Sequence, residues 1–140
     1  YGFELAADWQ PMKDWRLRFA YSYLHQNMDQ GTNTNYEKGN RHQLSLLSSW
    51  EIGHHLELDA WWRYVNAPNT WVTLSSFGTL RIDPYSSLNL RLGWRPRQDL
   101  ELSLVGANLL DKSHLEFAQE AFTYPVEIER SIYGQLKWSF

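Results

Sequence analysis

The sequence predicts an all-β protein built on an antiparallel sheet of seven strands. Apolar and polar residues alternate over segments of about ten residues, which is the signal of strands whose two faces differ. No apolar run approaches the roughly 20 residues that a membrane-spanning helix needs. The connections between the alternating segments switch regularly between short turns and long polar loops. Together these three features favour a sheet of long, sequentially paired strands.

The first two expected strands turn their apolar residues to one face. In the first strand, the residues of one face are Phe3, Leu5, Ala7 and Trp9, and those of the opposite face are Glu4, Ala6, Asp8 and Gln10. After a turn at residues 11–14, the second sets Trp15, Leu17, Phe19, Tyr21 and Tyr23 against Arg16, Arg18, Ala20 and Ser22. A polar loop is expected from about residue 26 to residue 40.

The third and fourth strands repeat the pattern. The third sets Leu44, Leu46, Trp50 and Ile52 against Gln43, Ser45, Ser49 and Glu51, and it turns at residues 53–55. The fourth sets Leu56, Leu58, Ala60, Trp62 and Tyr64 against Glu57, Asp59 and Arg63. A second long loop is expected over residues 66–82.

Three more strands complete the series. The fifth sets Leu88, Leu90, Leu92 and Trp94 against Asn89, Arg91, Gly93 and Arg95 and turns at residues 96–99. The sixth sets Leu100, Leu102 and Leu104 against Glu101 and Ser103. After a third long loop at about 111–126, the last sets Ile132, Leu136, Trp138 and Phe140 against Ser131, Gln135, Lys137 and Ser139.

Two regularities favour a transmembrane β-barrel. If all short turns lie at one end of the strands, all long loops lie at the other, as in outer-membrane barrels. The apolar face also carries rings near the short turns, as a membrane-interface girdle would: Trp9, Trp15, Trp50, Trp94, Trp138 and Phe140. Tyr23, Tyr64 and Tyr85 lie near the other end. A soluble barrel, with its apolar face turned inward, is the alternative.

Composition excludes several other classes of protein. The chain of 140 residues has no cysteine, so it offers neither disulfides nor thiolate metal sites. A net charge of −3 without a basic cluster argues against nucleic acid as a partner. No catalytic motif appears, and no enzymatic step or cofactor is expected. A metal site is not expected either, because His54 and His55 are neighbours, and neighbouring side chains on a strand or tight turn point apart.

Three segments near the end of the chain resemble TonB-dependent outer-membrane receptors. They are residues 88–96 (LNLRLGWRP), 100–112 (LELSLVGANLLDK) and 129–140 (ERSIYGQLKWSF). Residues 108–112 are similar to that family's strand-end motif, and residues 130–133 to the opening of its final strand. The ending Leu136, Trp138 and Phe140 resembles the signal read by the barrel assembly machinery.

The resemblance implies a barrel of about 22 strands in the outer membrane of a Gram-negative bacterium, with a plug domain in its lumen. Seven strands cannot close such a barrel. We therefore expect residues 1–140 to be the C-terminal segment of the barrel domain, without the plug and with only an indirect link to TonB. The implied function is active uptake of a scarce nutrient, above all a ferric siderophore. A passive porin, a small outer-membrane barrel and a soluble ligand-binding barrel remain alternatives.

Ligand contacts are expected on the polar face and in the loops. Arg63 and Arg91 suit carboxylates of a siderophore or of the plug, because a guanidinium binds carboxylates through paired hydrogen bonds. The polar face also carries both signs of charge, so charge pairing within the wall is the simpler interpretation of each residue. Loop rings that could stack on a metal complex from outside are Trp71, Phe77, Phe117, Phe122 and Tyr124.

Overall fold

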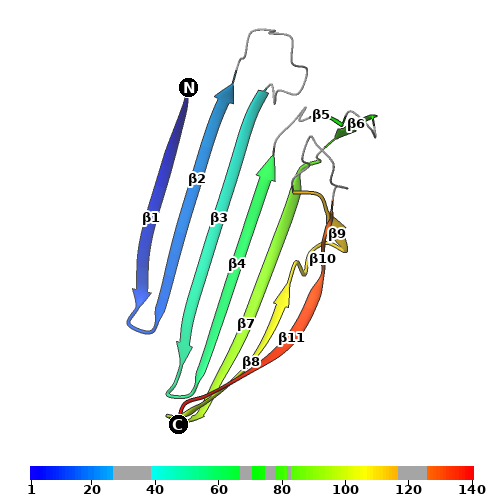
Figure 1. Cartoon of the computed structure of the whole chain (residues 1–140). Helices are drawn as coiled ribbons and strands as arrows, with labels where there is room; N and C mark the ends of the chain where they lie inside the picture. The colour runs from blue at the N-terminus through cyan, green and yellow to red at the C-terminus, as the bar shows by residue number, and fades with distance from the viewer. Residues whose placement is uncertain (27–38, 67–70, 75–77, 82, 117–125) are drawn as a thin grey trace.

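A computed structural model describes residues 1–26, 39–66, 71–74, 78–81, 83–116 and 126–140. Seven strands form one antiparallel sheet in the order β1-β2-β3-β4-β7-β8-β11 (Figure 1). Their bounds are Gly2–Met12 (β1), Trp15–Gln26 (β2), Gly39–Ile52 (β3), Leu56–Asn66 (β4), Tyr85–Arg97 (β7), Leu100–Ala107 (β8) and Ser131–Trp138 (β11). The seven strands expected from alternation are therefore all confirmed.

Two short ribbons accompany the main sheet. Trp71–Leu74 (β5) pairs with Gly78–Arg81 (β6), and Ser113–His114 (β9) pairs with Ile128–Glu129 (β10). The alternation pattern placed both regions in loops, since segments this short carry too little periodicity to be recognised. In the part of the chain that the structure describes, no helix has the length and apolar character required to cross a membrane.

The connections are sorted by length, as predicted. Figure 1 shows the short turns after β1, β3 and β7 at one end of the sheet and both ribbons at the other. The turn after β3 begins at Gly53, whose φ of 66° suits a residue without a Cβ atom. Pro11 and Pro96 lie inside β1 and β7 rather than in the turns, each where the register shifts, because proline cannot donate to a ladder.

The pairing register carries the apolar face across all seven strands. One row runs from Trp9 to Leu17, Ser48, Ala60, Leu90, Gly106 and Ile132. A second runs through the adjacent rings of Trp15 and Trp50, whose centroids are 6.2 Å apart, to Leu58, Leu92, Leu104 and Gly134. Neither row contains an Asp, Glu, Lys or Arg side chain.

The apolar face is exposed and the opposite, polar face holds most of the buried side chains. Leu104 on the apolar face is 56% exposed and Trp94 is 48% exposed, whereas Ser87 and Ser103 on the polar face are only 3% and 9% exposed. A contiguous apolar surface of this extent marks contact with lipid or with protein. This polarity is the reverse of that expected for a soluble barrel.

The sheet is open, since β1 and β11 are its edges and do not pair with each other. One ring differs from the predicted girdle. Tyr85 was expected near the loop end of the apolar face, but it pairs with Val65 and lies on the polar face. Its strand continues unbroken to Leu88 and Leu90 on the apolar face, so an odd-numbered position there must point the other way.

Candidate functional site on the polar face

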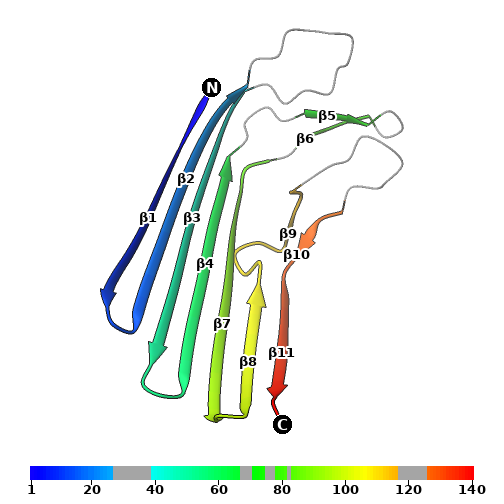
Figure 2. The same ribbon diagram turned by 60° about the vertical axis from the view of Figure 1, so that its left-hand side comes forward.

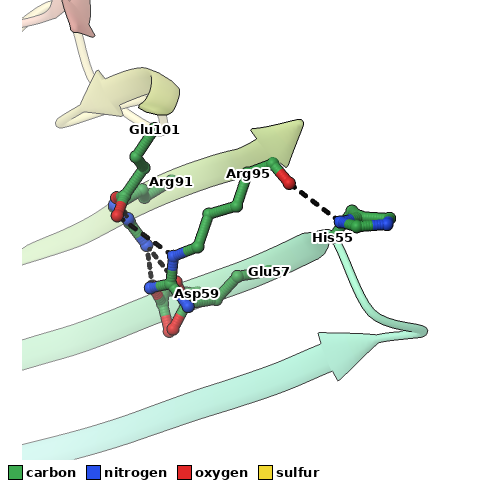
Figure 3. A network of polar contacts seen from close by, with 6 residues as sticks. All are labelled: His55, Glu57, Asp59, Arg91, Arg95 and Glu101. Atoms are coloured by element: carbon green, nitrogen blue, oxygen red, sulfur yellow. Dashed lines mark hydrogen bonds and ion pairs between the residues drawn. The ribbon is translucent and has the colours of Figure 1, made fainter. Parts of the chain in front are cut away.

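A network of five charged residues lies on the polar face toward the short-turn end (Figure 3). The Arg91 guanidinium donates to Glu57 and to Asp59, each at 2.9 Å, and it also pairs with Glu101. Arg95 adds contacts to Glu101 at 3.1 Å and Glu57 at 3.2 Å. We call Glu57, Asp59, Arg91, Arg95 and Glu101 the Arg91 network.

Register and one glycine bring the Arg91 network together. Asp59 pairs with Arg91 across β4 and β7, and Glu57 pairs with Gly93. A Cβ atom at Gly93 would stand 3.1 Å from the Arg91 Nη2 atom, so the bare backbone there gives the guanidinium room to lie along the strand. A side chain at this position would require the Arg91 guanidinium to shift, and glycine leaves the space open in the middle of a long strand.

For Arg91, the structure therefore favours charge pairing within the wall over contact with a ligand. Its charge meets three carboxylates, and its side chain is only 26% exposed. A second group of ion pairs joins Asp8 to Arg16 and Arg18 across β1 and β2. Both groups are fixed by residues on neighbouring strands.

A second cluster surrounds Arg63 toward the loop end of the same face. Arg63 donates to Glu116 at 3.2 Å, and the same Glu116 oxygen accepts from His114 Nε2 at 3.1 Å. The His114 ring stacks on Tyr85 with 4.1 Å between centroids, and the Arg63 guanidinium lies 4.7 Å from the centre of the Trp61 ring. We call Trp61, Arg63, Tyr85, His114 and Glu116 the Arg63 cluster.

The Arg63 cluster retains unused hydrogen-bonding capacity. Within the described residues, Arg63 Nε and His114 Nδ1 are both buried and have no hydrogen-bond partner. Such atoms are costly to bury alone, so they are natural points for a further partner. Among the described residues, Arg63 pairs with one carboxylate, whereas Arg91 pairs with three.

Trp61 is a residue of this site that the alternation pattern did not assign. It pairs with Leu47 and Asn89 on the polar face, is 41% exposed, and donates from Nε1 to Ser45 Oγ at 2.9 Å. The signal was present in the sequence as the adjacent pair Trp61 and Trp62. Neighbours in a strand point to opposite faces, so one of two consecutive tryptophans must leave the apolar face.

A hollow with a volume of about 570 Å³ lies on the polar face beside Arg63. Strands β1 to β4 and the start of β7 contribute to it. Its lining includes Glu4, Ser22, Gln43, Ser45, Arg63 and Tyr85. We call this hollow the trough.

The base of the third long connection is fixed by the two motifs of the last two strands. Asn108 is 2% exposed and adopts φ 52°, and its amide donates to the Ile128 carbonyl at 3.0 Å while Asn89 accepts from its backbone N–H. Arg130 donates from its backbone to Lys112 and from Nε to the Asp111 carbonyl. These contacts join residues 108–112 to residues 128–130, and Figure 2 shows β9 and β10 beside the start of β11.

The other predicted site residues fall in different places. Trp71 opens β5, but its side chain lies outside the described part of the chain, as do Phe77, Phe117, Phe122 and Tyr124. Leu136 and Trp138 lie on exposed β11, with Phe140 just beyond it. His54 and His55 lie in the turn after β3, where His55 Nδ1 is 2.8 Å from the Arg95 carbonyl.

The open antiparallel sheet, with an exposed apolar face and an ion-paired polar face, defines the wall of a membrane barrel. The family model described as TonB dependent receptor-like, beta-barrel matches residues 1–109, and the chain belongs to that family. Membership implies the bacterial outer membrane and a role in transport and reception. The match ends at Leu109, so the motif at residues 129–140 lies beyond it. No curated protein and no solved structure matches the chain.

Proposed function

We propose that this chain forms part of the wall of a receptor that takes up a ferric siderophore across the outer membrane in a TonB-dependent manner. The observation that carries the proposal is the opposite character of the two faces. Lipid suits the uncharged apolar face, and a water-filled or plug-filled lumen suits the polar face. The family supplies the transport class, and an anionic metal complex is the substrate that an arginine-bearing wall favours.

Arg63 and the loop rings are the proposed points of ligand contact. The unpaired Nε of Arg63 and the trough beside it favour Arg63 over Arg91, whose guanidinium already meets three carboxylates. Trp71, Phe77, Phe117 and Tyr124 would contact the substrate earlier, from the external side. The Arg91 network would face the plug, through which TonB would act.

Uptake in whole cells tests the proposed function. A strain that lacks the gene should lose accumulation of a radioactive ferric siderophore, screened across catecholate, hydroxamate and carboxylate types, and the complete gene should restore it. Restored uptake should disappear when TonB is deleted. Uptake that persists without TonB would indicate a passive porin, and no effect on any ferric siderophore would reject the substrate class.

Assembly by the barrel machinery is the second part of the proposal. Leu136, Trp138 and Phe140 lie on or just beyond the edge strand β11 and expose more than half of their surface, so they are open to a recognition partner. Removal of Phe140 should lower the amount of heat-modifiable, folded barrel in the outer membrane several-fold. An unchanged amount would reject this role and leave Phe140 as an interfacial ring.

A further inference from the structure

We propose that the trough binds an elongated small molecule with an oxyanion at one end and a protonated amine or hydroxyl donor at the other. The inference rests on the proposed function, because solutes reach the polar face only if it lines a lumen. It names the charge pattern of the ligand and the residues that meet each end. Its two anchors are Arg63 on β4 and Glu4 on β1, both in the lining of the trough.

The floor of the trough is made of small side chains aligned by register. Ala6 pairs with Ala20, Ala20 with Ser45, and Ser45 with Arg63, so these four residues form one row across β1 to β4. The first three side chains of the row are only methyl and hydroxymethyl groups. The next row toward the short turns contains Leu47 and Trp61, which are much larger. The hollow is therefore the space that the Ala-Ala-Ser row leaves between taller neighbours.

Arg63 equips one end of the trough for an oxyanion. Its Nη2 atom contacts Glu116 at 3.2 Å, while Nε has no partner among the described residues. A guanidinium binds a carboxylate best through two parallel N–H bonds, and the single contact to Glu116 leaves that capacity incomplete. Because Nε is shielded from solvent, an incoming carboxylate or other oxyanion would pair with the guanidinium by replacing Glu116.

Glu4 equips the other end for a donor. Its side chain is exposed and lines the trough, and it lines a neighbouring hollow together with Arg41. β1 and β4 are separated by three inter-strand steps, or about 14 Å between backbones. Ser22 and Gln43 lie in the same cross-strand row as Glu4 and offer polar groups along the way.

The size of the trough fits a small molecule. Its volume of about 570 Å³ falls within the roughly 300–1,000 Å³ typical of ligand sites. The trough combines a wide small-residue floor with two opposite charges at separate ends. That arrangement suits an extended zwitterionic or acid-alcohol ligand.

Protection of an engineered cysteine tests the proposal in the barrel expressed from its complete gene. The chain has no native cysteine, so Ala20→Cys places a single thiol in this chain, on the trough floor. Its reaction with N-ethylmaleimide is followed with and without ω-amino-carboxylates from aminohexanoate to aminododecanoate. We expect the reaction to slow, with one chain length most effective, while Gln135→Cys on β11 reacts at an unchanged rate.

Charge variants in the Ala20→Cys background assign the two ends. Arg63→Gln should raise the half-protecting concentration at least tenfold for the amino-carboxylates and for simple fatty carboxylates of equal length. Glu4→Gln should do so for the amino-carboxylates only, because a fatty carboxylate never uses Glu4. Folded state is checked by heat-modifiable migration, and if Arg63→Gln fails to assemble, Arg63→Lys should give an intermediate loss of protection.

Three results would overturn the proposal: no protection at any chain length, protection that Arg63→Gln leaves unchanged, or an unreactive thiol before any probe is added. The last would mean that protein already fills the trough. These failures are separable from failure of the proposed function. TonB-dependent siderophore uptake without protection rejects only the trough, whereas protection without uptake rejects only the transport assignment.

Discussion

Single residues on the polar face determine how the charges of the sheet are paired. Arg91 faces Glu57, Asp59 and Glu101, and the four side chains are only 21–27% exposed. Loss of the Arg91 cation would leave Arg95 alone to compensate three neighbouring carboxylates in a poorly solvated place. The network depends on Arg91 more than on Arg95, whose side chain is 55% exposed.

Arg91→Gln should therefore destabilise the folded barrel. We expect roughly 1–3 kcal/mol, below the about 3–5 kcal/mol seen when a fully buried pair is broken, because water still reaches these side chains. Urea unfolding in detergent micelles measures it. The double variant with Glu101→Gln should recover part of the loss, since it removes one of the uncompensated charges. Strictly additive losses would contradict this picture of the network.

Asn108 performs a different task at the same scale. Its left-handed backbone turns the chain out of β8, and its buried amide ties that turn to Ile128. The sequence resemblance marked residues 108–112 as a motif without giving the reason for it. The structure supplies the reason, because only a small polar residue that tolerates positive φ can both turn the chain and donate to a carbonyl across the connection.

Asn108→Ala should cost about 1–3 kcal/mol for the lost buried hydrogen bond and roughly 1 kcal/mol more for the strained backbone. Asn108→Gly is the matched control, because glycine keeps the backbone conformation and removes only the amide. Thermal or urea unfolding compares the two variants. Equal stability of Asn108→Ala and wild type would show that the amide is not required.

At the scale of strands, alternation carries most of the information. The cross-strand rows through Trp9 and Trp15 contain no charged side chain, because in every strand alternate residues point to the apolar face and the pairing brings these residues together. This is why the order of strands and their faces could be predicted. Parity also explains why Tyr85 is not part of the girdle, because its odd position in β7 places it on the polar face although it lies near the loops.

A charge on the apolar face tests the orientation of a strand. Leu46→Arg, at a position 38% exposed on β3, should destabilise the inserted barrel by about 2–4 kcal/mol if the face meets the bilayer midplane. Ser49→Arg on the same strand is the control, since it points to the polar face opposite Asp59. Reversible folding into lipid vesicles gives both values. A larger loss for Ser49→Arg would reverse the assignment of the faces.

At the scale of the whole molecule, the open sheet controls behaviour in water. β1 and β11 each present one unpaired edge, and the side chains of the apolar face are exposed or half-buried. We therefore expect residues 1–140, expressed alone, to aggregate without detergent. Size-exclusion chromatography measures whether the chain aggregates, and circular dichroism measures whether it is folded. A folded, soluble monomer would mean that the apolar face is covered in a way that this sheet does not show.

The candidate site was less predictable than the fold. The sequence predicts Arg63 and Arg91 as candidates because both lie on the polar face and a guanidinium binds carboxylates. Which carboxylates each one meets depends on register and, for Arg63, on Glu116, more than 50 residues away. The trough is invisible in the sequence, because it arises where Ala6 and Ala20 meet across two strands. When two residues become neighbours only because their strands pair, their contact cannot be predicted from their spacing along the chain.

The long parallel course of the strands has a mechanical consequence. A pull directed along the strands would load every hydrogen bond between two neighbouring strands at once, while a pull across the sheet would open them one by one. Each of the five internal strands of the main sheet is held in this way on both sides. Under a load along the strands, we therefore expect the sheet to resist as a unit.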